Sequence, residues 1–379
     1  MKNIGLFGGS FNPIHQEHVK IALHGVKELK LDKLFIIPTY IAPHKQGEEV
    51  ISGEHRLNMI KLAFEGNNNI EPCDYEIKSG GVSYSYLTIS HFKKVYPLSK
   101  LYFFMGSDML ENFPTWKNPE FITQNAQIVL IERKGENLKN ETLIKNIKKL
   151  YNHDVILLSV YGEDVSSTEI RIRKMLNLSL DGLVLKEVED YIDKNNLYSE
   201  NKYYTYVKNT LPEKRRLHTL GVILTALKLA KKLNVDKKKV EISALLHDCA
   251  KYVEVDDLEK YDIPKNCPKE VMHQYVGAYV AEKILNVKDA EILLAIKFHT
   301  SGRKEMTLLE KIIYTADIIE PSRKFLGVEE LRLAVEKDFE SGFLICIAEI
   351  LEFLKKQGGD IYPLSIEACE YYKNKQMEN

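Results

Sequence analysis

The sequence of 379 residues is poor in cysteine and contains a single tryptophan. Its cysteines are scattered, and no two of them have the Cys-x-x-Cys spacing that is typical of zinc ribbons and redox pairs. This excludes a disulfide framework as the source of stability, and we predict a reducing cytoplasm as the compartment. The five cysteines are Cys73, Cys249, Cys267, Cys346 and Cys369.

The sequence also lacks an excess of charge, a long apolar run and any low-complexity tract. Lys and Arg number 53 and Asp and Glu number 54, which gives a formal net charge of −1. Attraction of the whole chain to nucleic acid or to an anionic membrane is therefore not expected. No apolar run approaches the ~18 residues that cross a bilayer, and the N-terminus begins on a strand rather than on a leader. We predict no nucleic-acid partner and no membrane partner, and a homo-oligomer stays open.

The chain is long enough for two domains, and its two halves have different sequence patterns. Up to about residue 200, short apolar runs alternate with helix-length segments, which predicts a parallel sheet covered by helices on both faces. Such a Rossmann-like sheet binds ligands at the carboxyl ends of its strands. We predict strands at 4–7, 33–38, 70–73, 101–105, 128–132 and 155–158, and helices at 19–29, 54–64, 86–96, 120–123 and 183–194.

From residue 203 onward the strand pattern stops, and only helix-length periodic segments remain. This half is predicted to be an all-α bundle. The polar run 195–202 places the boundary near residue 200, so the predicted domains are 1–200 and 201–379. The helices of the second domain are predicted at 205–211, 213–233, 237–251, 270–285, 289–299, 308–319 and 328–357, followed by a short terminal segment.

Residues 5–18 have the pattern of a strand that breaks into a phosphate-binding turn. The apolar run ends at Gly8 and Gly9, which permit backbone angles that other residues resist, and a helix begins near His15. His15 and His18 are three residues apart, so they share one face of that helix above its amide-rich N-terminus. This arrangement predicts a site for a nucleoside triphosphate.

A second helix start, far along the chain, has a similar composition. Ser166, Ser167 and Thr168 place hydroxyl groups at a helix N-cap, and Arg171 follows one turn later. Amide groups, hydroxyl groups and a guanidinium bind phosphate through charge-assisted hydrogen bonds. By itself this motif is equally consistent with an ordinary helix cap. Together with the histidine turn, it predicts the other side of a triphosphate site.

These motifs resemble the bacterial nicotinate-nucleotide adenylyltransferases over about residues 1–198. The first and last of them fit any nucleotidyltransferase of the superfamily, whereas the Pro-His-Lys, Gly-Ser-Asp and Trp motifs are typical of the nicotinate branch. The resemblance rests on Gly8-Gly9-Ser10-Phe11-Asn12-Pro13-Ile14-His15, His18, Pro43-His44-Lys45, Arg56, Ser83-Tyr84-Ser85, Gly106-Ser107-Asp108, Trp116, Arg133-Lys134-Gly135 and Ser167-Thr168-Glu169-Ile170-Arg171.

The resemblance implies transfer of AMP from ATP to nicotinate mononucleotide with Mg²⁺, giving deamido-NAD and pyrophosphate without a protein nucleophile. It implies catalytic roles for His15, His18, Lys45 and Arg171. The residues that it implies for ATP binding are Gly8, Gly9, Ser10, Phe11, His15, His18, Gly106, Asp108, Ser167, Thr168 and Arg171. Those for nicotinate mononucleotide binding are Lys45, Ser85, Asp108, Trp116 and Arg133.

Two positions depart from the pattern of this family. Glu17 stands where glycine is usual, and Leu87 stands where aspartate is usual. On a helix Glu17 lies ~200° around the axis from His15, so we expect its carboxylate to point away from bound phosphate. Another acceptor, such as a pantetheine phosphate or a cytidylyl acceptor, stays an alternative.

In the second half, an ionisable pair closes an apolar run. His247 and Asp248 follow the apolar residues 242–246, a place where packing alone does not select charge. Imidazoles and carboxylates without thiolates suit Fe, Mn or Mg better than a structural zinc ion. The other candidate ligands, each on a separate predicted helix, are His218, His273, His299 and Asp317.

In their order these residues resemble the HD superfamily of metal phosphohydrolases, over about residues 203–375. The surrounding motifs resemble the bacterial enzymes that split diadenosine tetraphosphate symmetrically into two ADP. These motifs are Arg216-Leu217-His218-Thr219-Leu220-Gly221-Val222, Leu246-His247-Asp248-Cys249-Ala250-Lys251, Gly277-Ala278-Tyr279, Phe298-His299-Thr300-Ser301-Gly302-Arg303 and Ala316-Asp317-Ile318-Ile319-Glu320-Pro321-Ser322-Arg323.

This resemblance implies a centre of two Fe or Mn ions that share Asp248, which is also the implied catalytic residue. His218, His247 and Asp317 would complete one ion, and His273 and His299 the other. Hydrolysis of another nucleotide, or a nucleotide-sensing regulatory role, stays an alternative. The implied polyphosphate-binding residues are Lys251, Thr300, Arg303 and Arg323.

The two resemblances together predict a bifunctional nucleotide enzyme. Its fold is expected to be an α/β Rossmann-like nucleotidyltransferase domain followed by an all-α HD-domain bundle. The expected small-molecule partners are ATP, nicotinate mononucleotide and diadenosine tetraphosphate.

Overall fold

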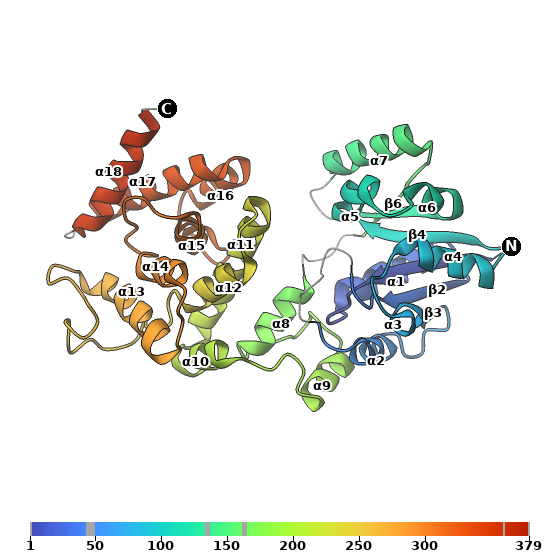
Figure 1. The fold of residues 1–379 in the computed structure, drawn as a ribbon, viewed down its shortest axis with the longest axis horizontal. Helices are drawn as coiled ribbons and strands as arrows, with labels where there is room; N and C mark the ends of the chain where they lie inside the picture. Colours follow the sequence, from blue (N-terminus) through green and yellow to red (C-terminus); the bar gives the residue numbers. More distant parts are fainter. Residues whose placement is uncertain (1, 43–49, 133–136, 161–164, 359–360, 378–379) are drawn as a thin grey trace. The chain divides into compact units, whose positions relative to one another are not determined.

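The computed structural model describes residues 2–42, 50–132, 137–160, 165–358 and 361–377 (Figure 1). The chain forms two compact units. Unit 1 consists of residues 1–171 and 180–198, and unit 2 consists of residues 172–179 and 199–379. Helix α8 (Ser167–Met175) therefore begins in unit 1 and ends in unit 2. The domain boundary near residue 200 stays a prediction.

Unit 1 is built on a parallel sheet with the strand order β3-β2-β1-β4-β5-β6. Strand β1 pairs with β2 on one side and with β4 on the other, so the direction of the strand order reverses between β1 and β4. Open parallel sheets bind ligands in the crevice at such a point. The strands are β1 (Asn3–Gly9), β2 (Lys33–Pro38), β3 (Ile70–Pro72), β4 (Lys100–Gly106), β5 (Gln127–Glu132) and β6 (Ile156–Ser159).

The side chains of each central strand alternate between two apolar cores, one on each face of the sheet. On β4, Leu101, Phe103 and Met105 belong to one core, and Tyr102 and Phe104 belong to the other. Because both faces are buried, the strands have uninterrupted apolar runs rather than an alternation of apolar and polar residues.

Helices cover both faces of the sheet (Figure 1). One face is covered by α1 (Gln16–Glu28), α2 (Gly53–Ala63), α9 (Lys186–Lys194) and the first turn of α8. The other face is covered by α4 (Ser85–Val95), α5 (Ser107–Asn112), α6 (Pro119–Asn125) and α7 (Asn137–Tyr151). The short helices α3 (Tyr75–Ser79) and η2 (Phe113–Thr115) complete the unit.

The predicted strands and helices of unit 1 are confirmed, with ends displaced by a few residues. Helices α3, α5 and α7 were not predicted. Helix α7 is rich in Asn and Lys, and of its side chains Ile147 is buried in the core while Leu143 and Ile144 pack against it. An apolar stripe this narrow gives a weak helical signal in the sequence.

The secondary structure of unit 2 consists of helices and includes no strand among the residues that the structure describes, as predicted. Its helices are α10 (Lys202–Thr210), α11 (Glu213–Leu233), α12 (Lys237–Leu246), α13 (Lys269–Tyr279), η3 (Val280–Ile284), α14 (Ala290–Lys297), α15 (Leu308–Ile319), α16 (Val328–Lys337), α17 (Phe339–Gln357) and α18 (Pro363–Met377). They pack around one apolar core, which also contains Ile172, Leu176 and Leu178.

Two helix predictions for unit 2 are wrong, one at its end and one within the predicted range. The helix predicted at 237–251 ends at Leu246, so His247 and Asp248 lie in the turn that follows. The helix predicted at 328–357 is interrupted at Asp338, whose backbone is extended and whose carboxylate accepts a hydrogen bond from the Ser341 amide. The carboxylate caps a new helix there, so one long helix becomes α16 and α17.

The five cysteines are free thiols, and Cys73 is the one among them that is not buried. Among the residues that the structure describes, no helix is long and apolar enough to cross a membrane.

Gly342 lets α17 pack closely against the end of α16. A Cβ atom at this position would lie 2.5 Å from Val335 Cα and 2.6 Å from Val335 N. Alanine is favoured over glycine inside a helix by roughly 1 kcal/mol, but overpacking against fixed atoms costs roughly 1–3 kcal/mol. We therefore expect Gly342→Ala to lower the melting temperature of unit 2, as measured by scanning calorimetry.

Glu349→Ala is the matched control, because Glu349 lies at an exposed position of the same helix. Its melting temperature should stay at the wild-type value. An equal melting temperature for Gly342→Ala and wild type would contradict the close packing of these two helices.

Two candidate active sites

The first candidate site forms where β1 ends. His15 is the N-cap of α1, and the rings of His15 and His18 stack with their centroids 3.7 Å apart. The ring of Phe11 contacts His18 at an angle, with a centroid distance of 4.9 Å. The two imidazoles therefore lie together at the N-terminus of a helix, where the helix dipole favours anions, although the Gln16 amide already donates to the Leu183 carbonyl.

Gly8 leaves open space in front of the backbone at this turn. Among the described residues, nothing lies within 4 Å of the place that a Cβ atom of Gly8 would occupy, whereas the same position at Gly9 would lie 3.0 Å from the Phe11 ring. The packing of this part of the chain therefore does not require glycine at position 8. A residue without a side chain at the end of the central strand lets a ligand approach the backbone closely, which fits a phosphate.

The structure brings the second predicted phosphate-binding motif to the same turn. The Ser167 hydroxyl donates a hydrogen bond to the carbonyl of Pro13, 154 residues away, over 2.8 Å. Arg171 donates to the Asn12 carbonyl over 2.7 Å and to Thr168 Oγ1 over 3.1 Å. The N-termini of α1 and α8 therefore meet at the end of β1.

Two side chains remote in sequence support this turn: Tyr198, which the sequence motifs do not single out, and Arg56, which is one of the residues of the family resemblance. The Tyr198 hydroxyl donates to Asn12 Oδ1 over 2.9 Å, and burial raises the pKa of Tyr198 above its usual value. Tyr198 also has a φ of 57°, a left-handed conformation that costs a non-glycine residue about 1–2 kcal/mol. From the other side, the buried Arg56 donates to the Ser10 carbonyl over 2.9 Å.

The next predicted residues follow β4, the strand beside β1. Gly106 ends β4, and Asp108 lies in the first turn of α5, where its Oδ1 accepts a hydrogen bond from the Met109 amide over 3.0 Å. Both therefore lie at the edge of the sheet where β1 ends. Lys45 and Arg133 lie outside the described residues.

The residues predicted for the mononucleotide come from two neighbouring segments. Ser85 begins α4, and Trp116 follows η2. The Lys117 ammonium lies 4.7 Å from the centre of the Tyr84 ring, which brings these segments together. The Trp116 ring is partly buried, and its centroid lies 5.5 Å from that of Phe113.

The two departures from the family pattern lie on α1 and α4. The Glu17 carboxylate forms an ion pair with the Lys20 ammonium over 2.6 Å, so its charge is compensated within α1. Leu87 in α4 is exposed to solvent.

The second candidate site lies in unit 2, where α11 to α15 converge. The structure brings all six predicted metal ligands together. Five of them are buried, and Asp317 Oδ1 lies 3.1 Å from His218 Nε2. His218 is in α11, His247 and Asp248 follow α12, His273 is in α13, His299 follows α14, and Asp317 is in α15.

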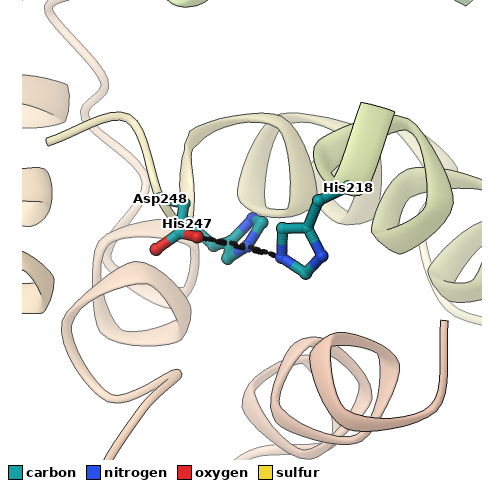
Figure 2. Close-up of side chains that lie close together, drawn as sticks. All are labelled: His218, His247 and Asp248. Atoms are coloured by element: carbon teal, nitrogen blue, oxygen red, sulfur yellow. Dashed lines mark hydrogen bonds and ion pairs between the residues drawn. The ribbon is translucent and has the colours of Figure 1, made fainter. Parts of the chain in front are cut away.

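Asp248 lies between two pairs of histidines, one of which is drawn in Figure 2. Its Oδ2 is 3.8 Å from His218 Nε2 and 3.6 Å from His247 Nε2. Its Oδ1 is 3.1 Å from His273 Nε2 and 3.6 Å from His299 Nε2. In each group the three ligand atoms lie within 4.8 Å of one another. One carboxylate can therefore serve two cations, one with each oxygen.

Hydrogen bonds outside the cluster decide which nitrogen of an imidazole faces inward. His247 Nδ1 lies 2.7 Å from the Ala244 carbonyl, and His299 Nδ1 lies 2.8 Å from the Ile296 carbonyl. A carbonyl oxygen only accepts, so each Nδ1 carries the hydrogen and each Nε2 presents a lone pair.

These lone pairs point at other histidines. His247 Nε2 lies 3.3 Å from His218 Nε2, and His299 Nε2 lies 3.1 Å from His273 Nε2. Burial lowers the pKa of His247 to about 3, so this imidazole is neutral and can bind a cation. Burial alone would raise the pKa of Asp248, but the surrounding imidazoles hold it well below its usual value. The donor set fits divalent cations.

Glu320 contacts His218 of the first histidine pair, a role that the sequence motifs do not indicate. It is fully buried, and its Oε1 lies 3.0 Å from His218 Nδ1 while its Oε2 accepts from the Ser322 amide over 2.7 Å. A Cβ atom at Gly221 would lie 2.3 Å from Glu320 Oε2, so glycine makes room for this carboxylate. Glu320 follows Asp317 by three residues, a spacing that could have indicated it.

Arg215 is a second residue at the cluster for which the sequence motifs predict no role. Its guanidinium donates to Asp248 Oδ2 over 2.8 Å. Arg215 precedes His218 by three residues in α11, so both side chains lie on one face of that helix.

Two predicted polyphosphate-binding residues contact the second histidine pair. The Lys251 ammonium lies 3.2 Å from His273 Nε2 and 3.9 Å from Asp248 Oδ1. Thr300 Oγ1 lies 2.9 Å from His299 Nε2.

The two predicted arginines differ in their surroundings. Arg323 forms an ion pair with Asp317 and so lies at the cluster. Arg303 instead donates two hydrogen bonds to Glu310, over 2.6 and 2.8 Å. Glu310 is buried and also caps the start of α15, so the geometry gives Arg303 a structural contact rather than a place among the ligands.

Comparison with known proteins decides the family of the chain. Residues 6–173 match the family model described as cytidylyltransferase-like, and residues 215–322 match the HD domain. The chain is 31% identical, over 369 residues, to a probable nicotinate-nucleotide adenylyltransferase/Ap4A hydrolase of Mycoplasma genitalium, an alignment that covers 93% of this chain and 99% of that protein. The chain belongs to this family of fused enzymes.

Each half of this fused adenylyltransferase/hydrolase also has relatives of its own. The first is 37% identical over 201 residues to a probable nicotinate-nucleotide adenylyltransferase of Clostridium tetani, which covers 52% of this chain and 100% of that protein. The second is 41% identical over 164 residues to a symmetrical bis(5'-nucleosyl)-tetraphosphatase of Bacillus subtilis, which covers 41% of this chain and 88% of that protein. The predicted fold, a Rossmann-like nucleotidyltransferase followed by an HD bundle, is confirmed.

The contact between Glu320 and His218 gives a prediction about metal affinity. Carboxylates that orient a ligating imidazole contribute roughly 10–100-fold to metal affinity. We therefore expect Glu320→Ala to weaken Mn²⁺ binding to the metal-free chain by a factor in that range, as measured by isothermal titration calorimetry. Glu330→Ala, at an exposed position of α16, is the control and should bind Mn²⁺ like wild type. Equal affinities of the two variants would contradict this role of Glu320.

Proposed function

We propose that each unit of this fused enzyme carries one of its two activities. The chain is a nicotinate-nucleotide adenylyltransferase and a symmetrical bis(5'-nucleosyl)-tetraphosphatase, as its membership of the family over 93% of its length indicates. Unit 1 is assigned the transfer of AMP from ATP to nicotinate mononucleotide. Unit 2 is assigned the hydrolysis of diadenosine tetraphosphate to two ADP. The observation that supports this division is that two separate sites form, one in each unit.

The assignment of unit 1 rests on the convergence of two helix N-termini at the end of β1. Attack of the mononucleotide phosphate on the α-phosphorus of ATP needs little covalent help from the protein, and depends on positioning and on stabilisation of negative charge. His15 and His18 would hold the transferring phosphate, and Arg171 with Lys45 would neutralise its charge. Ser167 and Thr168 would bind the phosphate chain at the start of α8.

Further roles in unit 1 are proposed on the same basis. Mg²⁺ would bind with the triphosphate and spread its charge. Ser85 lies at the start of α4 and Asp108 in the first turn of α5, and both would bind the mononucleotide. Trp116 would stack on the pyridine ring of the mononucleotide. The partly buried position of the Trp116 ring leaves one part of it accessible for such a contact.

His18→Ala tests the assignment of unit 1. Loss of one well-placed donor to a transferring phosphate typically lowers kcat about 10²–10³-fold. We expect a loss of that size in pyrophosphate release from ATP and nicotinate mononucleotide. His24→Ala, on the same helix two turns later, should keep the wild-type rate. Unchanged hydrolysis of diadenosine tetraphosphate by the same preparation would show that the chain is folded, and a wild-type kcat for His18→Ala would contradict the assignment.

The assignment of unit 2 rests on the position of Asp248 between two histidine pairs. Bound divalent cations supply an activated water and neutralise phosphate charge. We propose Fe or Mn, because nitrogen and carboxylate donors without thiolate suit these ions. Lys251, Thr300 and Arg323 lie at the cluster and would bind the polyphosphate, whereas Arg303 would have to leave Glu310 to join them. A sensor that only binds nucleotides would not need two complete groups of ligands.

Asp248→Ala tests the assignment of unit 2. It removes the ligand that both cation positions share, so we expect ADP production from diadenosine tetraphosphate to fall by more than about 100-fold. Metal analysis after anaerobic purification should show fewer ions per chain than in wild type. Asp256→Ala, at an exposed position a few residues later, is the control. A wild-type chain that binds metal without producing ADP would instead favour a sensor or a different nucleotide.

A further inference from the structure

A cavity of about 520 Å³ opens beside the first histidine pair, and His218 and Glu320 form part of its wall. One candidate metal ligand, His218, therefore lies in the wall of this cavity. Apart from His218, Glu320 and Ser322, the wall is formed by cationic and aromatic side chains.

The cationic side chains form a series that leads away from the cluster. Arg215 and Arg323 lie nearest to it, because they pair with Asp248 and with Asp317. Lys214 and Lys324 come from the neighbouring positions in the chain and line the same cavity, where both are exposed. A polyphosphate that extends from the metal ions into the cavity would therefore meet positive charge along its length.

Two aromatic rings line the same cavity without being buried. Tyr252 is 59% exposed and Phe325 is 41% exposed. Rings that the core of this unit needs are buried, as Tyr204 and Phe343 are. Exposed rings beside cationic side chains are the composition with which proteins stack nucleic-acid bases.

Short connections fix both rings relative to the cluster. Tyr252 follows Asp248 by four residues, and Phe325 follows Arg323 by two. Burial lowers the pKa of Arg215, but the Asp248 carboxylate and the neighbouring Tyr252 hydroxyl outweigh burial and raise this pKa above its usual value. The first ring therefore lies near a guanidinium that donates a hydrogen bond to Asp248, the candidate ligand that both cation positions share.

We infer that this cavity binds one nucleoside diphosphate half of the substrate, with its base against Tyr252 and Phe325 and its phosphates along Arg215 and Arg323. The inference rests on the proposed hydrolase activity of unit 2. This role for the cavity explains why the exposed rings of Tyr252 and Phe325 lie beside the candidate metal ligands. Because stacking recognises the face of a base, removal of the rings should weaken binding of nucleotides but not of inorganic polyphosphate.

The experiment compares Tyr252→Leu, Phe325→Leu and the double variant with wild type, each as the full chain loaded with Mn²⁺. Loss of one base-stacking ring should raise KM for diadenosine tetraphosphate at least about 5-fold, and the double variant should show a larger rise. The inhibition constant of inorganic tripolyphosphate, which has no base, should stay at the wild-type value. Tyr252→Phe, which keeps the ring, should restore the wild-type KM.

Phe353→Leu is the matched control, because Phe353 is a comparably exposed ring (54%) on α17 that does not line this cavity. Its KM should equal that of wild type. A direct binding measurement with the fluorescent probe 1,N6-etheno-ADP on metal-free chain should show lower affinity for the double variant than for Phe353→Leu.

The outcomes separate this inference from the function on which it rests. If wild-type chain with Mn²⁺ does not hydrolyse diadenosine tetraphosphate, the proposed function of unit 2 fails. If it does so and the double variant keeps the wild-type KM, only the nucleotide-binding cavity is overturned. If KM and the tripolyphosphate constant rise together, the rings act through the shape or charge of the cavity, and stacking is overturned.

Discussion

The candidate metal site of unit 2 depends on hydrogen bonds that turn imidazole lone pairs toward one another in a buried cluster. His247 and His299 donate through Nδ1 to carbonyl groups three residues earlier, at the ends of α12 and α14. The last carbonyls of a helix have no partner within the helix, so each histidine satisfies one of them while its Nε2 is directed inward. The hydrogen bond that ends the helix is thus the same one that orients the ligand.

In unit 1, hydrogen bonds fix a backbone turn in a similar way to the imidazoles of unit 2. The carbonyls of Ser10, Asn12 and Pro13 all accept hydrogen bonds from side chains that are remote in sequence. Because these acceptors are already occupied, the turn is held in one conformation before a ligand arrives. A preorganised site of this kind does not have to reorganise as charge develops on a transferring phosphate.

The sequence contains strong local signals for the elements of the fold and for the order of the ligands. Buried parallel strands such as 101–105 have continuous apolar runs, and Gly8, Gly9, His15 and His18 are close enough in sequence to be interpreted together. The partners of these residues are not local. Tyr198 reaches Asn12 across 186 residues, and Glu320 reaches His218 across 102. Such pairs are set by packing, which one sequence does not reveal.

Local competition explains the two errors in the predicted helices. At Asp338 a side chain that caps the next helix outweighs continuous helical periodicity, and after Leu246 the chain forms a turn in which His247 Nδ1 bonds to the Ala244 carbonyl. The phosphate-binding role of Arg303 stays a prediction, and its guanidinium contacts Glu310. The roles of the individual site residues stay predictions.

Helix α8 has a consequence for attempts to obtain the two activities as separate proteins. Ile172, Leu176 and Leu178 lie in the core of unit 2, although the chain returns to unit 1 for residues 180–198. Expression of the second half alone from residue 199 would omit three core side chains, each contributing roughly 1.5–3 kcal/mol through burial. The corresponding first half would carry the same three side chains without their core. No single cut divides this chain into two intact pieces.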